Sequence, residues 1–238
     1  MNVHKLLLPT AILVAFACLT TAVAGATVAG TTVAGPPPVL STNRGCFTVG
    51  QPVVITGTGF APARMFELSL AGGVDLGVST TDASGDFTAT IHPGGLGANH
   101  VQAVEILDAT DGTSTSKAMI TVTRTTGARV IVTGGSTVTT VRAQFQIWGF
   151  ALVNGQPPVT SASTQLPVYL HYVSPHNALK KTFPLGNTGG QCGYLKTKSR
   201  RVFPFVPGPG SWTLQVDTSR SYSKHPAGPV ARIDVRVT

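Results

Sequence analysis

The chain has 238 residues, of which 11% are charged and 42% are hydrophobic, and its formal net charge is +8. This hydrophobic content excludes a disordered chain, and the 27 glycines and 17 prolines disfavour a helical bundle because both residues weaken helices. The length suits two domains of about 100 residues each.

The positive charge is concentrated in the second half of the chain. Residues 26–124 contain four Lys and Arg against seven acids, whereas residues 125–238 contain twelve Lys and Arg against two acids. We expect the second half to attract polyanions or an acidic surface. The alternative is that the two halves neutralise each other where they meet.

Residues 1–24 have the three-part pattern of a secretory signal peptide. Lys5 precedes an apolar run from Leu6 to Leu19, and Ala22 and Ala24 form an A-x-A cleavage site. The run is short for a membrane span, so cleavage is favoured over an uncleaved anchor. Residues 15–17 fit a lipidation site badly, which disfavours a lipoprotein. With no second apolar span, the mature chain is expected to be secreted or associated with the cell surface, without a transmembrane span.

Two cysteines, Cys46 and Cys192, remain if Cys18 leaves with the signal peptide. Exported proteins meet an oxidising environment, so we expect these two to pair, with two free buried thiols as the alternative. The bridge would join the two expected domains. Neither cysteine lies in a C-x-x-C motif or near clustered histidines, so no metal site and no cofactor are predicted.

Residues 25–38 are expected to be a linker that ends in three prolines, followed by a first domain over residues 39–124. Short segments with alternating hydrophobic residues, separated by Gly- and Asp-containing turns, predict antiparallel strands with one buried face. These strands are expected at 52–56, 65–70, 76–80, 86–92, 100–107 and 117–124.

Two motifs in this domain resemble the immunoglobulin (Ig)-like modules of exported bacterial proteins. The pattern G-x-G-F-x-P is matched by Gly57, Gly59, Phe60 and Pro62, and T-D-x-x-G-x-F is matched by Thr81, Asp82, Gly85 and Phe87. The glycines permit a tight bend, Phe60 is expected to close one end of the sandwich, and Asp82 with Gly85 predicts a hairpin turn. The resemblance covers residues 46–124 and implies a fold, not an activity.

The second domain, residues 125–238, is interpreted as a divergent β-sandwich. Its strands are expected at 129–133, 141–148, 166–173, 179–185, 194–203, 211–217 and 231–237. Residues 168–218, with "VYLHYVSP" and "GSWTLQVDTSRSY", resemble a module of exported proteins of actinobacterial type. That resemblance implies neither a catalytic role nor a ligand.

The segment 180–205 carries the candidate site. Its basic residues fall on two neighbouring expected strands, and in "KTKSR" they alternate, which places them on one strand face. The residues predicted to form this basic face are Lys180, Lys181, Lys196, Lys198, Arg200 and Arg201. Export favours an anionic cell-envelope polymer, an acidic glycan or a protein partner over nucleic acid.

Catalytic motifs are missing from the sequence. There is no nucleophile elbow, metalloprotease motif, phosphate loop or dinucleotide fingerprint. Asp217 is expected to cap a turn, and His171 to lie at a surface or edge position. A metal pair of His171 and His176 lacks a third ligand. The acidic turns at Asp82 and Asp111 are interpreted as hairpin turns rather than weak Ca²⁺ loops.

The sequence therefore predicts an all-β chain of two tandem antiparallel Ig-like β-sandwich domains behind a signal peptide and a Pro-containing linker. The favoured function is non-enzymatic binding of an anionic envelope polymer or partner. The alternatives are a structural module whose basic domain docks on the acidic first domain, and an enzyme of unrecognised type. The oligomeric state is left open.

Overall fold

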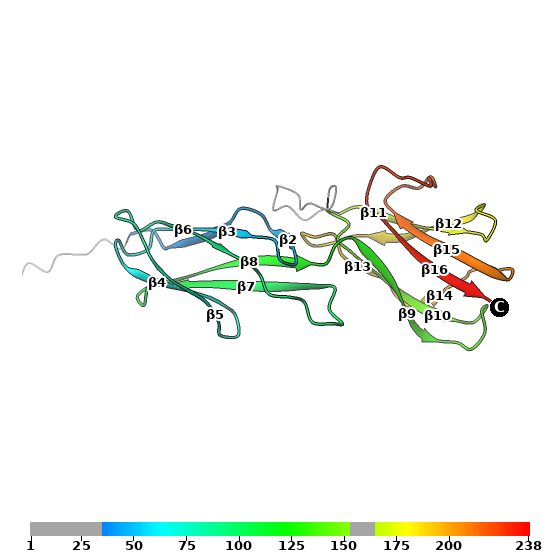
Figure 1. Ribbon diagram of the computed structural model, residues 1–238, viewed down its shortest axis with the longest axis horizontal. Coiled ribbons are helices and arrows are strands. Elements are labelled where there is room, and N and C mark those ends of the chain that lie inside the picture. Colours follow the sequence, from blue (N-terminus) through cyan, green and yellow to red (C-terminus); the bar gives the residue numbers. More distant parts are fainter. Residues whose placement is uncertain (1–34, 153–164) are drawn as a thin grey trace, which may run out of the picture. The chain divides into compact units, whose positions relative to one another are not determined.

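The computed structural model describes residues 35–152 and 165–238, and in these ranges the secondary structure is β-strands and turns without helices. The expected signal peptide at 1–24, most of the expected linker and residues 153–164 lie outside the described residues. Strands β1–β8 form a first sandwich and β9–β16 a second sandwich (Figure 1). The expected domain limits, 39–124 and 125–238, place their division between β8 and β9.

The first sandwich packs a three-stranded sheet on a five-stranded sheet. The smaller sheet has the order β1-β3-β6, with β1 Val39–Thr42, β3 Val53–Thr58 and β6 Phe87–Ile91. The larger sheet has the order β2-β8-β7-β4-β5, with β2 Cys46–Thr48, β8 Thr115–Thr123, β7 Gln102–Thr110, β4 Met65–Leu70 and β5 Val74–Thr80. All neighbours are antiparallel except β2 and β8, which run parallel.

The second sandwich also consists of two sheets. One has the order β12-β11-β15-β16, with β12 Leu179–Asn187, β11 Pro167–Val173, β15 Gly210–Asp217 and β16 Val230–Val237. The other is centred on β10 Arg142–Trp148, which pairs along its length with β9 Gly127–Gly134. Because β9 occupies one edge of β10, the short strands β13 Leu195–Lys196 and β14 Arg200–Arg201 share the other edge.

The two sandwiches have the same topology when β2 is set aside as an added strand. In each, the first, second and fifth strands form one sheet, and the third, fourth, sixth and seventh form the other. For this count β13 and β14 together are the fifth strand of the second sandwich. This division of seven strands is an arrangement of the immunoglobulin fold. The chain is thus a tandem of Ig-like β-sandwiches, as the sequence predicted.

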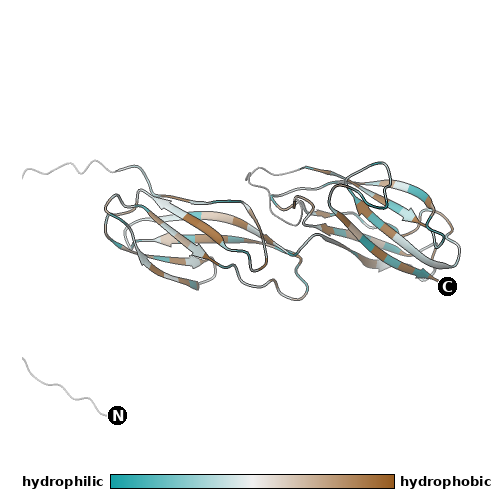
Figure 2. Ribbon diagram, turned by 45° about the horizontal axis from the view of Figure 1, so that its top comes forward, coloured by the Kyte–Doolittle hydropathy of each residue, from teal (hydrophilic) through white to brown (hydrophobic). Residues whose placement is uncertain are grey.

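Each sandwich has its own hydrophobic core between its sheets. Figure 2 shows hydrophobic and hydrophilic residues alternating along the strands, which is the pattern of sheets with one buried face. In the first core the rings of Phe66 and Phe87 stack at 3.8 Å, and Phe60 lies 5.4 Å from Phe87. Phe60 is buried, as expected of a residue that closes the sandwich.

The two sequence motifs of the first domain contact each other in this core. A Cβ atom on Gly57 would collide with the Phe87 ring, so a glycine is required at this approach. The Phe60 amide donates to the Gly85 carbonyl at 3.1 Å. Asp82 accepts from the amides of Ser84 and Asp86 at 2.8 and 2.9 Å, so it forms a tight turn as expected. The turn is not the expected hairpin, because it connects β5 and β6, which belong to different sheets.

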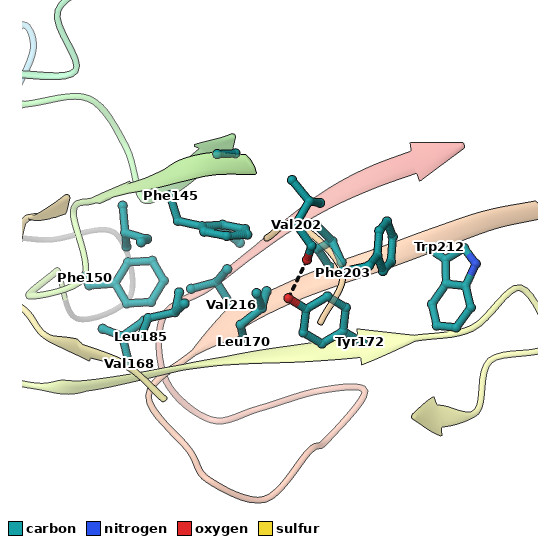
Figure 3. Packing of buried hydrophobic residues seen from close by; sticks show 14 of the residues in the cluster. Phe145, Phe150, Val168, Leu170, Tyr172, Leu185, Val202, Phe203, Trp212 and Val216 are labelled. Atoms are coloured by element: carbon teal, nitrogen blue, oxygen red, sulfur yellow. Dashed lines mark hydrogen bonds between the residues drawn. The ribbon is translucent and has the colours of Figure 1, made fainter. Parts of the chain in front are cut away.

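The second core contains an aromatic cluster at one end. Figure 3 shows Phe203 and Tyr172 side by side with Trp212 beyond them, and the Tyr172 hydroxyl donates to the Val202 carbonyl at 2.6 Å. Phe205 completes the cluster, 5.3 Å from Tyr172 and 5.5 Å from Trp212. These rings pack in or against the core, where large apolar rings are most stable.

The strands differ from the prediction in three respects: in number, in one parallel pair and in one interrupted strand. Strands β1 and β2 were not anticipated, and the parallel pair of β2 and β8 departs from an all-antiparallel fold. The single strand expected at 194–203 is split into β13 and β14. The Thr197 hydroxyl accepts the Phe145 amide proton at 2.9 Å, in place of a main-chain carbonyl, and this side-chain contact interrupts the strand ladder.

A disulfide joins Cys46 of β2 to Cys192, in the turn before β13, with the Cα atoms 5.2 Å apart. The expected pairing is therefore confirmed. The bridge lies in a small buried cluster with Leu152. It covalently links the two sandwiches over a sequence separation of 146 residues.

Candidate functional site

The structure divides the six predicted basic residues between two sheets. Lys180 and Lys181 lie on β12, an edge strand of one sheet, whereas Lys196, Arg200 and Arg201 lie on β13 and β14 of the opposing sheet. The expectation that these segments pair as neighbouring strands was wrong, because both β13 and β14 take their hydrogen bonds from β10. The two edge strands instead border the same side of the second sandwich.

The outer face of the β10 sheet carries four cations, one of which, Arg129 of β9, is opposite Gln146 and donates to its side chain. Ala143, Phe145 and Ile147 point into the core, so the alternate residues of β10 point outwards. Arg201 is directly opposite Arg142, and Lys196 is directly opposite Gln146. Directly opposed residues share a face, so Arg142, Lys196 and Arg201 form an outward-facing group that we call the basic strip.

The basic strip follows the direction of β10. Its two ends are four residues apart on that strand, which corresponds to about 13 Å. Lys198, between β13 and β14, is also exposed, whereas its neighbour Thr197 is buried. Lys196 and Lys198 are thus both exposed, but the predicted alternation onto one face does not extend to Arg200, which is opposite the core residue Ala143.

Arg200 has a different role from its neighbours. It is opposite the core residue Ala143 and is half-buried. Its guanidinium donates to the Pro184 carbonyl of β12 at 3.3 Å, so this side chain bridges the two edge strands. Of the six predicted residues, Arg200 is the one most directly engaged in holding the sandwich together.

Arg142 belongs to the basic strip but was not among the predicted residues. It is exposed, and its guanidinium donates to the Ser199 carbonyl at 3.0 Å. Arg142, Gln144 and Gln146 alternate in sequence with Ala143, Phe145 and Ile147, which is a pattern that indicates an outer face for Arg142. The register that sets it against Arg201 depends on a pairing 59 positions along the chain, which alternation does not reveal.

Acidic side chains do not neutralise the basic strip. In the described ranges 35–152 and 165–238, the ion pairs are Lys117–Asp108 and His171–Asp217, and neither involves a predicted basic residue. Strands β9, β10, β13 and β14 contain no Asp or Glu. Arg142 and Arg201 therefore repel each other across the strands without a compensating carboxylate on the sheet.

His171 and Asp217 form a buried pair, so the expectation of a surface or edge histidine was wrong. Nε2 of His171 lies 3.1 Å from Oδ1 of Asp217, and Nδ1 lies 2.9 Å from the Thr182 hydroxyl. Both residues point away from the core, but the segment after β15 covers them: Tyr222 contacts the histidine ring at 5.7 Å. The side chains are 0% and 1% exposed, so substrate has no access to this dyad.

Asp217 caps the turn after β15, as predicted. Its Oδ1 accepts the Ser219 amide at 2.9 Å and its Oδ2 accepts the Gln215 side chain at 2.8 Å. Burial raises the pKa of Asp217, but the hydrogen bonds from His171, Gln215 and Ser219 outweigh it and leave the pKa below its usual value. The carboxylate is thus an acceptor that organises the turn.

The acidic turns of the first domain are satisfied by backbone amides. Asp111 accepts the amides of Ala61, Thr113 and Ser114 at 2.7 to 2.9 Å. The Ala61 amide is the largest cause of a pKa of Asp111 far below its usual value. No group of three or more metal-ligating side chains occurs in the part of the chain that the structure describes.

Comparisons with known proteins establish no family. No protein-family model matches the chain, and no curated protein matches it. Similar solved structures include bovine butyrophilin, with 7% identity over 85% of this chain and 100% of that chain, at a TM-score of 0.32. The human OSCAR ligand-binding domain has 11% identity over 85% of this chain and 99% of that chain, at a TM-score of 0.32. A tetra-tandem repeat in the extending region of a large adhesion protein has 11% identity over 85% of this chain and 49% of that chain, at a TM-score of 0.31. The fold assignment rests on the strand pairing itself. Across residues 35–152 and 165–238 there is no helix with the length and hydrophobicity to cross a membrane.

Proposed function

We propose that the protein is a non-enzymatic, secreted or surface-associated module that binds an anionic polymer of the cell envelope through its second sandwich. The contact would be made by the basic strip together with Lys198, with Lys180 and Lys181 on the neighbouring edge strand. Arg200 would position the edge strands rather than contact the polymer.

The observation that carries this proposal is the like-charge pair of Arg142 and Arg201 on a sheet face without acids. Like charges directly opposite each other destabilise a sheet. A bound polyanion would offset this repulsion, and a row of charges along a strand suits an extended chain of anionic groups. Buried His171 and Asp217 give no support to a catalytic role for the same domain.

The proposal is tested by retention of the protein on immobilised polygalacturonate, with neutral dextran as the reference matrix. We expect retention on the anionic matrix alone, and a steep loss of retention as salt rises, because exposed charges are screened at about 10 Å in 0.1 M salt. The triple variant Lys196→Glu, Lys198→Glu, Arg201→Glu is expected to abolish retention.

A matched control separates the basic strip from net charge. Arg220, Lys224 and Arg236 are exposed and lie on other parts of the second sandwich. Reversing these three charges changes the net charge by the same amount as reversing those of the site. The control variant is expected to keep most of its retention. Equal loss in both variants, or retention independent of salt, would contradict the proposal.

A further inference from the structure

A second feature of this domain is a cavity of about 640 Å³ at the end of the second sandwich that holds the aromatic cluster. The residues that line it come from the turn between β11 and β12, the start of β12, the segment between β14 and β15, and the start of β15. This volume is in the range of sites for small organic ligands. All the segments that line it belong to the same sandwich.

One wall of the cavity is apolar and aromatic. Phe205, Val206, Pro209 and Trp212 form it, together with Pro175 of the β11–β12 turn. Val206 is 80% exposed, so its side chain is accessible to a ligand. The Trp212 indole donates to the Gly208 carbonyl at 2.8 Å, which ties the segment before β15 to the buried Trp212 side chain. A preformed wall binds a ligand with a smaller ordering cost than a flexible loop.

The other wall is basic. Lys180 and Lys181 line the cavity, and none of the residues that line it in the described chain is acidic. Lys181 is opposite the core residue Tyr172, so its side chain starts on the inner side of the edge strand. Its ammonium lies 4.8 Å from the ring centre of Phe183, a cation–π contact with a residue next to the cavity lining. Two lysines thus line the cavity together with apolar side chains.

We propose that this cavity binds a compact organic anion, in which one acidic group is carried on an aromatic or branched apolar body. The acidic group would contact Lys180 and Lys181, and the apolar body would pack on Phe205, Val206 and Pro209. The inference shares two lysines with the proposed polymer site and rests on the proposed function to that extent. It differs from the polymer proposal because the ligand of the cavity must have an apolar body, whereas binding to the basic strip requires only negative charge.

The probe is 1-anilinonaphthalene-8-sulfonate, a dye that joins an aryl body to a sulfonate and fluoresces when it leaves water. We expect saturable fluorescence at one dye per full-length chain. N-phenyl-1-naphthylamine, the same body without the sulfonate, is expected to bind at least about tenfold more weakly, because hydrogen bonds to charged groups are stronger than neutral ones.

Two variants locate the dye. Lys180→Ala with Lys181→Ala is expected to weaken dye binding about tenfold or more, and Val206→Glu is expected to weaken it similarly by placing a like charge on the apolar wall. Lys196→Ala with Lys198→Ala removes the same charge outside the cavity and is expected to leave dye binding unchanged. All these side chains are exposed, so folding is expected to persist.

The inference is overturned if both lysine pairs weaken the dye equally, if the sulfonate makes no difference, or if the dye binds at many unsaturable sites. Retention on polygalacturonate is read separately. Saturable dye binding without retention would remove the polymer proposal alone, and retention without saturable dye binding would remove the cavity proposal alone.

Discussion

The carboxylate of Asp217 accepts a hydrogen bond on each oxygen while it contacts His171, 3.1 Å away, on a sheet face that the following turn covers. Replacing Asp217 by Ala would leave the Ser219 amide and one N–H of the Gln215 side chain without their buried acceptor. The His171 ring would keep only the Ser219 carbonyl, 3.1 Å from Nε2, on that side. We expect the free energy of unfolding to fall by about 3 kcal/mol, measured by urea denaturation at pH 7. Asp234→Ala is the control. That exposed carboxylate accepts a single hydrogen bond from Thr213, so its loss is expected to cost less than about 1 kcal/mol.

The same carboxylate predicts acid sensitivity. The pKa of Asp217 is lowered in the folded protein from an ordinary value of 3.8. A group with a lowered folded pKa contributes stability that is present above its ordinary pKa and is lost as pH falls towards the folded value. We expect the wild type to lose stability below about pH 4, and Asp217→Ala to lose less over the same interval. Urea midpoints measured between pH 6 and pH 2 test this. An equal decline in both proteins would contradict the assigned shift.

Much of the fold was readable from local pattern. Met65–Leu70 was predicted with the bounds it has in the structure, because Phe66 and Leu68 alternate with polar or exposed neighbours. β10 and β16 were found for the same reason. The turn at Asp82 was found from a side chain that bonds its own backbone. These signals depend on residues within one strand or turn, which is the range over which a sequence pattern carries information.

The remainder depends on contacts between distant segments. His171 alternates as an outward residue should, and only the segment around Tyr222 makes it buried. The basic residues of β12 and β13 are close in sequence, yet each strand hydrogen-bonds to a different sheet. β2 is three residues long and takes its place from pairing with β8. The predicted site therefore differs from the structure more than the predicted fold does.

The disulfide between Cys46 and Cys192 is expected to contribute to the free energy of unfolding. Cys46 and Cys192 close a loop over 146 positions. In the chain-entropy account, a disulfide that closes a loop of this length raises the free energy of unfolding by about 4–5 kcal/mol, because it restricts the unfolded chain. We expect Cys46→Ala with Cys192→Ala to lower the urea midpoint of the folded protein. Replacing both cysteines avoids a stray thiol. Unreduced peptide mapping of the wild type is expected to show one linked pair of peptides, and two free thiols would contradict the pairing.

Tyr172 gives a prediction for the second core. Its hydroxyl donates to the Val202 carbonyl at 2.6 Å while the residue is 2% exposed, and burial raises the pKa of this phenol well above its usual value. Tyr172→Phe keeps the ring contacts and removes the hydrogen bond. We expect a loss of about 1–2 kcal/mol in the free energy of unfolding, measured by urea denaturation. A loss near that of a large cavity, about 4 kcal/mol, would mean that the ring itself had moved.

A comparison of Gly85 and Gly112 separates two reasons why a position requires glycine: a left-handed backbone, and a lack of space for a Cβ atom. Both have a left-handed backbone, with φ of 85° and 83°. A Cβ atom on Gly85 would collide with the Phe60 carbonyl, whereas one on Gly112 would meet open space. Gly112→Ala is expected to cost about 1 kcal/mol, the price of the backbone conformation. Gly85→Ala carries that cost and also displaces the carbonyl of a residue that closes the first core, so we expect a loss at least about 2 kcal/mol larger. Urea denaturation of the two variants measures the difference directly. Equal losses would show that Phe60 moves without cost, and that the approach of the two motifs does not contribute to stability.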